Sequence, residues 1–151
     1  MASSESGPVG ELDHVGIVVA DLERARGWFE SVLGLDVSSE ATLGEGSLKI
    51  AFLEAGAARI ELVEVVDPEA RRERLGDAEA RIEHLAFRVA DLGEAAGRLE
   101  REGVELRGGL GADAPREPFS GAGTTSLFSR PESSAGVRVQ LVQPTSGEAQ
   151  E

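Results

Sequence analysis

The two histidines of this chain occupy matching places in its sequence. His14 and His84 each begin a short apolar run with the same residue pattern, and no other histidine is present. Imidazole nitrogen is the side-chain group that most commonly binds divalent transition metals. A lone histidine on an apolar strand is more often a core residue than a ligand, and that interpretation stays open for each one alone. Two solitary histidines at equivalent positions instead indicate one shared metal site.

A second pair of polar residues lies inside apolar segments further along the chain. Glu61 interrupts residues 60–63, and Gln140 interrupts residues 139–142. An inward-pointing carboxylate needs a partner, because burial of an unpaired charge costs several kcal/mol. The alternative is a polar side chain that faces water from a half-exposed strand. With the two imidazoles, this pair would make a nitrogen and oxygen ligand set for one divalent ion, such as Co²⁺, Ni²⁺, Zn²⁺, Mn²⁺ or Fe²⁺.

An internal repeat relates these residues to one another. Residues 12–22 align with residues 82–92 at an offset of seventy positions, which superposes the two histidines. Residues 59–63 align with residues 138–142 at an offset of seventy-nine, which superposes the carboxylate and the amide. A repeat constrains architecture more firmly than local propensity does. The second copy therefore carries about nine extra residues, which we place in the glycine-rich stretch 108–123.

Both copies predict the same order of elements. A β-branched, apolar run after each histidine predicts a buried strand. Asp21 and Asp91 then fit helix N-caps, and Gly34 and Gly103 fit the C′ positions that end those helices. Apolar residues between them recur at helical spacing. Three further strands are expected in each copy, over 35–39, 48–54 and 59–65 in the first and over 104–107, 124–128 and 137–143 in the second.

The predicted fold class is α+β, with two βαβββ modules related by a pseudo-twofold axis and forming a curved eight-stranded cleft. In that arrangement equivalent strands of the two modules face each other, so equivalent residues converge. The tails are expected to be disordered because they are polar and low in apolar residues. The predicted boundaries are a tail at 1–10, the first module at 11–66, a polar helical linker at 67–80, the second module at 81–144 and a tail at 145–151.

Composition excludes several classes of function. The net charge of −13 and the pI near 4.6 would repel a phosphate backbone, so we expect no nucleic acid partner. No apolar run approaches the roughly 20 residues that a bilayer requires, so we expect no membrane partner. The start of the chain does not read as a signal peptide, which favours a cytoplasmic protein. The absence of cysteine excludes disulfides, thiolate ligands and cysteine nucleophiles.

The repeated segments resemble the vicinal oxygen chelate (glyoxalase/bleomycin resistance) superfamily, most closely its methylmalonyl-CoA epimerases. The similarity spans Leu12 to Gln143. It is carried by the opening strand and helix start at 12–23, the Glu45-Gly46 loop, the strand at 60–64, the second histidine strand at 83–89 and the closing hairpin at 121–131 and 136–141. The resemblance implies a metal-dependent isomerase that removes and returns a proton α to an acyl thioester through a metal-stabilised enolate. It also implies an acyl-CoA substrate and a homodimer.

The resemblance assigns further roles to single residues. Glu45 is implied as a catalytic base, against the alternative of a solvated loop glutamate. The family has glutamate where this chain has Gln140, and an amide cannot accept a proton at neutral pH. We therefore infer that Glu61 is a metal ligand with some catalytic base character. Glu83 stands where the family usually has histidine. The implied substrate-binding residues are Gly121, Ala122, Gly123 and Arg130.

Two other functions are compatible with the same residues. One is a glyoxalase-like lyase, or another superfamily enzyme whose substrate is not a CoA ester. The other is a non-catalytic protein that binds a small molecule such as an antibiotic. Relatives of this last kind usually lack the four metal ligands, so both histidines of this chain argue against it.

Overall fold

The sequence repeat folds into two units with matching elements. The computed structural model describes residues 7–121 and 123–145, so the tail predictions for 1–6 and 146–151 lie outside the described residues. The first unit runs from His14 to His84, and the second unites the residues up to Asp13 with those from Leu85 onward. Strands β1 (Leu12–Val19) and β5 (Ala80–Arg88) each pass from one unit into the other. His84 therefore belongs to the first unit, although the repeat places it in the second copy.

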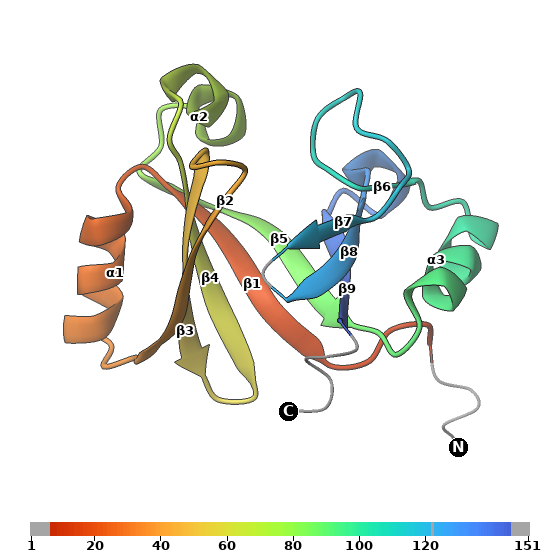
Figure 1. Cartoon of the computed structure of the whole chain (residues 1–151), viewed down its shortest axis with the longest axis horizontal. Coiled ribbons are helices and arrows are strands. Elements are labelled where there is room, and N and C mark those ends of the chain that lie inside the picture. Colours follow the sequence, from red (N-terminus) through yellow and green to blue (C-terminus); the bar gives the residue numbers. More distant parts are fainter. Residues whose placement is uncertain (1–6, 122, 146–151) are drawn as a thin grey trace. The chain divides into compact units, whose positions relative to one another are not determined.

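The first unit is a four-stranded mixed sheet with a helix packed on one face (Figure 1). Its strand order is β2-β3-β4-β1, with β1 and β4 parallel and the other neighbours antiparallel. Val19, Leu53 and Leu62 form the buried core under helix α1. The remaining elements of this unit are α1 (Leu22–Ser31), β2 (Val37–Leu43), β3 (Leu48–Ala55), β4 (Ala58–Val65) and α2 (Pro68–Leu75).

The second unit repeats this plan. Its strand order is β5-β9-β8-β6, with β5 and β9 parallel, and a short strand β7 also pairs with β8. Leu106, Leu127 and Leu141 lie in its buried core, against which Val9 from the N-terminal segment packs. The elements are α3 (Leu92–Arg101), β6 (Leu106–Arg107), β7 (Phe119–Gly121), β8 (Thr124–Ser129), a 3-10 turn (Pro131–Ser133) and β9 (Val139–Pro144).

Helices α1 and α3 begin in the same way, as the repeat predicts. Asp21 caps α1 and Asp91 caps α3, each by accepting a hydrogen bond from the amide three residues further on. A side chain from the last strand of the unit completes each cap. Glu64 Oε1 accepts from the first amide of α1 at 2.8 Å, and Gln143 Oε1 does the same for α3 at 2.6 Å. No helix in the described part of the chain is long and apolar enough to cross a membrane.

The predicted glycines after both helices adopt the left-handed conformation, with Gly103 at C′ of α3 and Gly34 one position beyond C′ of α1, but some strands differ from the prediction. Gly34 and Gly103 have φ angles of 74° and 94°, which a residue with a Cβ rarely adopts. Strand β2 continues to Leu43, beyond the predicted end at Ser39, because residues 39–43 keep pairing with β3. In the second unit the counterpart of β2 is split into β6 and β7 by residues 108–118, which lie in the stretch assigned to the extra residues.

Replacement of Asp91 by alanine is expected to destabilise the protein by about 1 kcal/mol, because α3 loses the side-chain oxygen that satisfies an amide of its first turn. Asp91→Asn keeps a capping oxygen and should unfold close to wild type. Urea denaturation followed by circular dichroism measures both. An Asp91→Ala protein as stable as Asp91→Asn would contradict this role.

Candidate metal centre

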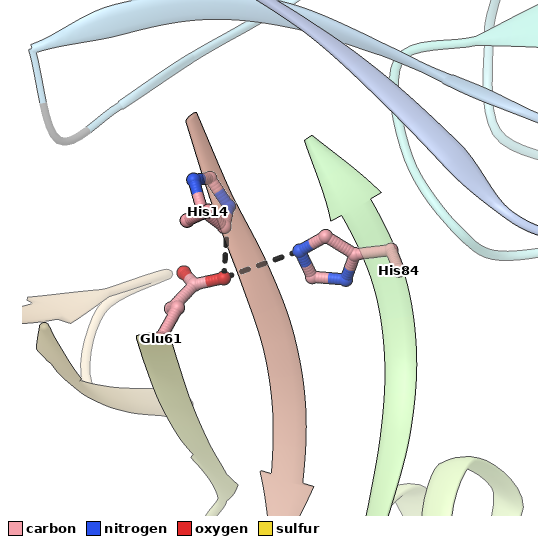
Figure 2. A group of neighbouring side chains, drawn as sticks. All are labelled: His14, Glu61 and His84. Carbon is pink, nitrogen blue, oxygen red and sulfur yellow. Dashed lines mark hydrogen bonds and ion pairs between the residues drawn. The ribbon is translucent and has the colours of Figure 1, made fainter. Parts of the chain in front are cut away.

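Three buried side chains from three strands of the first unit converge on one point. His14 comes from β1, Glu61 from β4 and His84 from β5, and Figure 2 shows their polar ends turned toward one another. One ligand atom of each lies within 4.8 Å of the others. Only 4%, 9% and 5% of the respective residues is exposed. The structure therefore brings together three of the four residues predicted to bind a metal.

Strand register explains how these side chains meet. The parallel pairing of β1 with β4 places Gly16 beside Glu61. His14 lies two residues before Gly16, so it faces the same side of the sheet. A Cβ atom added to Gly16 would overlap the imidazole ring of His84. The absence of a side chain at Gly16 therefore creates the space that this ring occupies.

The donor atoms are spaced as ligands of one ion would be. Glu61 Oε1 lies 3.3 Å from His14 Nε2 and 3.2 Å from His84 Nε2. Bonds of about 2.0–2.2 Å to one ion would separate neighbouring ligand atoms by about 2.8–3.6 Å, depending on whether the geometry is octahedral or tetrahedral. The two rings also meet edge to face, with centroids 5.5 Å apart. Two nitrogens and one carboxylate oxygen suit a divalent transition ion, so these residues fit the metal that we expected.

The other side of His84 also faces a carboxylate. Glu83 Oε1 lies 3.1 Å from His84 Nδ1, and Arg74 donates two hydrogen bonds to the same carboxylate. An ionised carboxylate only accepts hydrogen bonds, so Glu83 favours a proton on Nδ1. Without an ion, Glu61 likewise favours a proton on Nε2. A ring held between two carboxylates is thus stabilised either as imidazolium or as a neutral ring with a cation at Nε2.

The electrostatics follow from this arrangement. Burial by itself would raise the pKa of Glu61, but hydrogen bonds and charge from His14 and His84 outweigh it and lower the pKa to about 2. Burial likewise opposes the ionisation of Glu83, yet His84 and Arg74 lower its pKa to about 2. For His84, burial lowers the pKa, but the contacts with Glu61 and Glu83 raise it overall. Both carboxylates are therefore ionised at neutral pH and attract a cation.

The other two predicted ligand and catalytic residues are Gln140 and Glu45. Gln140 is on β9 of the second unit and only 9% exposed, and its Oε1 has no hydrogen bond partner among the described residues. Glu45 is exposed in the turn between β2 and β3, with a φ of 57°. Glu61 pairs with Phe52 of β3. The turn that holds Glu45 comes before Leu48, the first residue of β3, which lies about 13 Å along the strand from Phe52.

The predicted substrate-binding residues lie in the second unit. Gly121 ends β7, Gly123 follows in the turn before β8, and Ala122 lies outside the described residues. Arg130 follows β8, and its guanidinium donates a hydrogen bond to the backbone oxygen of Ala112. Their role toward a substrate stays a prediction.

The sequence did not indicate three residues that shape the site. Arg74 lies in a segment that reads as a polar linker, and its contact with Glu83 spans nine residues and two elements. Adjacent strand residues normally point to opposite faces, so alternation does not predict that Glu83 contacts His84. Gly16 fills a position where the second copy has Ala86. That difference between the copies was the available signal for a close approach.

Comparisons with known proteins agree with this fold. Residues 13–120 match the family model of the Glyoxalase/Bleomycin resistance protein/Dioxygenase superfamily. Uncharacterized protein YqjC of Bacillus subtilis (strain 168) is 31% identical over 141 residues, covering 90% of this chain and 94% of that protein. Ethylmalonyl-CoA/methylmalonyl-CoA epimerase of Cereibacter sphaeroides is 30% identical over 138 residues, covering 89% and 98% respectively.

A solved structure extends the similarity to the whole chain. The crystal structure of methylmalonyl-CoA epimerase from Mycobacterium tuberculosis has a TM-score of 0.81 and 30% sequence identity, and the match covers 100% of this chain and 97% of that one. The predicted α+β fold class and the predicted relationship are both confirmed. The chain is related to methylmalonyl-CoA epimerases, and it belongs to the glyoxalase, bleomycin resistance protein and dioxygenase superfamily.

Proposed function

We propose that this chain is a metal-dependent isomerase that removes the proton α to the thioester of an acyl-CoA and returns it to the opposite face. The observation that carries the proposal is the buried group of His14, Glu61 and His84 in a chain similar to named methylmalonyl-CoA epimerases. A divalent ion bound there would supply positive charge next to the substrate oxygens, which stabilises the negative charge that develops as the proton leaves.

Four residues are proposed to hold the ion. His14 and His84 would bind through Nε2, and Glu61 through Oε1, because these atoms already face one another. Gln140 is proposed as the fourth ligand through Oε1. Its support is twofold, since it matches Glu61 in the repeat and its buried Oε1 lacks a hydrogen bond partner among the described residues. The identity of the metal stays open among Co²⁺, Ni²⁺, Zn²⁺, Mn²⁺ and Fe²⁺.

Glu45 and Glu61 are proposed to move the proton. The exposed carboxylate of Glu45 lies in a turn about 13 Å along β3 from the row of Glu61, so this turn would have to approach the substrate for Glu45 to act as base. Glu61 sits at the site itself, but its low pKa makes it a weak base. We therefore assign Glu61 the role of ligand first and proton acceptor second.

The proposed substrate is an acyl-CoA held partly by residues of the second unit. A chain with a net charge of −13 needs local cations to bind the phosphates of CoA. Arg130 is proposed to be one of these cations, and Gly121, Ala122 and Gly123 are proposed to contact the substrate. A homodimer is proposed by analogy with the superfamily, and the cytoplasmic location expected from the sequence remains a prediction.

Protein loaded with Co²⁺ and incubated with methylmalonyl-CoA in deuterated buffer is expected to exchange the α-proton for deuterium. Treatment with a chelator should slow exchange by about 100-fold, because the charge that stabilises the developing anion is lost. Proton NMR of the substrate measures the rate. Re-addition of Co²⁺ to the chelated protein is the control and should restore it.

The same preparation distinguishes the alternatives. Conversion of a hemithioacetal without any α-proton exchange would reject the epimerase in favour of a glyoxalase-like lyase. Tight binding of an antibiotic by a protein that holds no metal and turns over neither substrate would reject catalysis altogether. The buried three-residue group is the feature that favours an enzyme over the binding protein.

Substitutions of single glutamates separate the proton-moving roles. Glu61→Gln is expected to retain metal, because its amide oxygen can still bind, and to lose about 100-fold in exchange rate. Glu45→Gln should lose a similar factor with full metal content if it is the other base. Glu54→Gln changes an exposed glutamate on β3, so it is the control and should leave the rate unchanged. A fully active Glu61→Gln protein would refute its role in proton transfer, and a fully active Glu45→Gln protein would refute that of Glu45.

Metal affinity is expected to rise with pH above the ordinary histidine pKa of 6.5. The pKa of His84 is raised, so its protonated form stabilises the metal-free protein below pH 6.5, and this stabilisation is lost as the pH rises through the raised pKa. An ion and a proton compete for Nε2, so the affinity for the ion rises over the same pH range. The difference in Tm between metal-loaded and metal-free protein should therefore widen as the pH rises, and a constant difference would contradict this prediction.

A further inference from the structure

Two charged residues hold His84 from the side opposite to Glu61. Glu83 Oε1 lies 3.1 Å from His84 Nδ1. Arg74 donates to Glu83 through Nε to Oε2 at 2.9 Å and through Nη2 to Oε1 at 2.7 Å. The side chains of Arg74 and Glu83 are 22% and 10% exposed. Two-pronged bonds between a guanidinium and a carboxylate fix geometry as well as adding strength.

We propose that Arg74 and Glu83 are positioning residues for the metal centre, with Arg74 holding Glu83 and Glu83 holding the Nδ1 proton of His84. The inference rests on the proposed function only in requiring a metal at Nε2, and it does not depend on the substrate. It assigns a role to two residues that bind neither metal nor substrate themselves.

The chemistry of imidazole makes this contact decisive for metal binding. A neutral ring carries one proton, on Nδ1 or on Nε2. Because the Glu83 carboxylate only accepts hydrogen bonds, it keeps a proton on Nδ1, so that Nε2, 3.2 Å from Glu61 Oε1, is the nitrogen that gives up its proton to an ion. Gly16 packs against the ring itself and limits its rotation. The orientation of His84 is thus set before an ion arrives, and the proton on Nδ1 stays in place when an ion displaces the proton on Nε2.

Helix α2 gains a function from this contact. It carries Arg74 in its last turn, and its buried Leu75 anchors it against Val18 and Val65 of the first unit. Without Arg74, the largely buried carboxylate of Glu83 would have to be balanced by His84 alone, which would favour a protonated ring over a metal-binding one. The segment between the two modules is therefore a support for the site as well as a connection.

Metal titrations of the metal-free protein test the proposal. Glu83→Gln and Arg74→Gln are each expected to weaken Zn²⁺ binding by about 10- to 100-fold, as loss of partners behind a metal-bound histidine does in other sites. A Glu83→Leu/Arg74→Leu protein removes both charges together, so it leaves no buried charge unpaired and should fold with a similar loss. Arg72→Gln removes a charge from an exposed position of the same helix and should bind like wild type. Wild-type affinity in both single variants would overturn the proposal.

A spectroscopic measurement separates positioning from a general loss of structure. Only two histidines are present, so ¹⁵N-labelled histidine gives two rings, and a His14→Gln variant assigns them. In the Zn²⁺-loaded wild type, His84 should show a Nδ1 proton protected from exchange with water, and the double leucine variant should lose that protection. An equally protected proton in this variant would overturn the proposal.

Epimerase activity is measured separately, so the two conclusions can fail independently. Altered affinity and Nδ1 protection in a protein that exchanges no α-proton would support the positioning role and reject the proposed reaction. Unchanged Zn²⁺ affinity and unchanged Nδ1 protection in variants of an enzyme that does exchange the α-proton would reject the positioning role and support the proposed reaction.

Discussion

The buried carboxylate of Glu61 is the constraint on which the site depends. An ionised group this deep in the protein is stable only if opposite charge or hydrogen bond donors surround it. His14 and His84 supply both from neighbouring strands, at 3.3 and 3.2 Å. On the far side of His84, Glu83 adds a second negative charge that Arg74 balances. One negative charge then remains, and either a protonated imidazole or a metal ion can neutralise it.

Duplication explains how the chain builds such a site from ordinary elements. Both copies use the same devices to start their helices, an aspartate cap and a polar side chain from the last strand. These devices tie the start of each helix to the strand that pairs in parallel with the histidine strand. The copies then diverge at one pair of predicted ligand positions, with Glu61 in one copy and Gln140 in the other. A common scaffold thus carries an uneven distribution of charge, concentrated in the first unit.

The repeat made most of the fold predictable from the sequence. Strands, caps and helix ends followed from apolar periodicity and from residues with strong local preferences, and the histidine pair followed from their matching positions. The convergence of His14, Glu61 and His84 was inferred in the same way, and the structure contains that group.

Features that depend on contacts between elements were not predictable in this way. Strand β7 exists through its pairing with β8, since residues 119–121 show no pattern of their own. The contact between Arg74 and Glu83 joins helix α2 to strand β5, and no local sequence pattern predicts how far apart these two elements lie. The exchange of strand segments between units, which places His84 with His14, likewise depends on tertiary structure.

The central claim is that an ion binds between these three side chains, and anomalous diffraction from crystals grown with Co²⁺ tests it most directly. If the ion binds there, one strong anomalous peak is expected about 2.0–2.2 Å from Nε2 of His14, Nε2 of His84 and a carboxylate oxygen of Glu61. Crystals that show no peak there, or a fully occupied ion bound elsewhere in the chain, would contradict it.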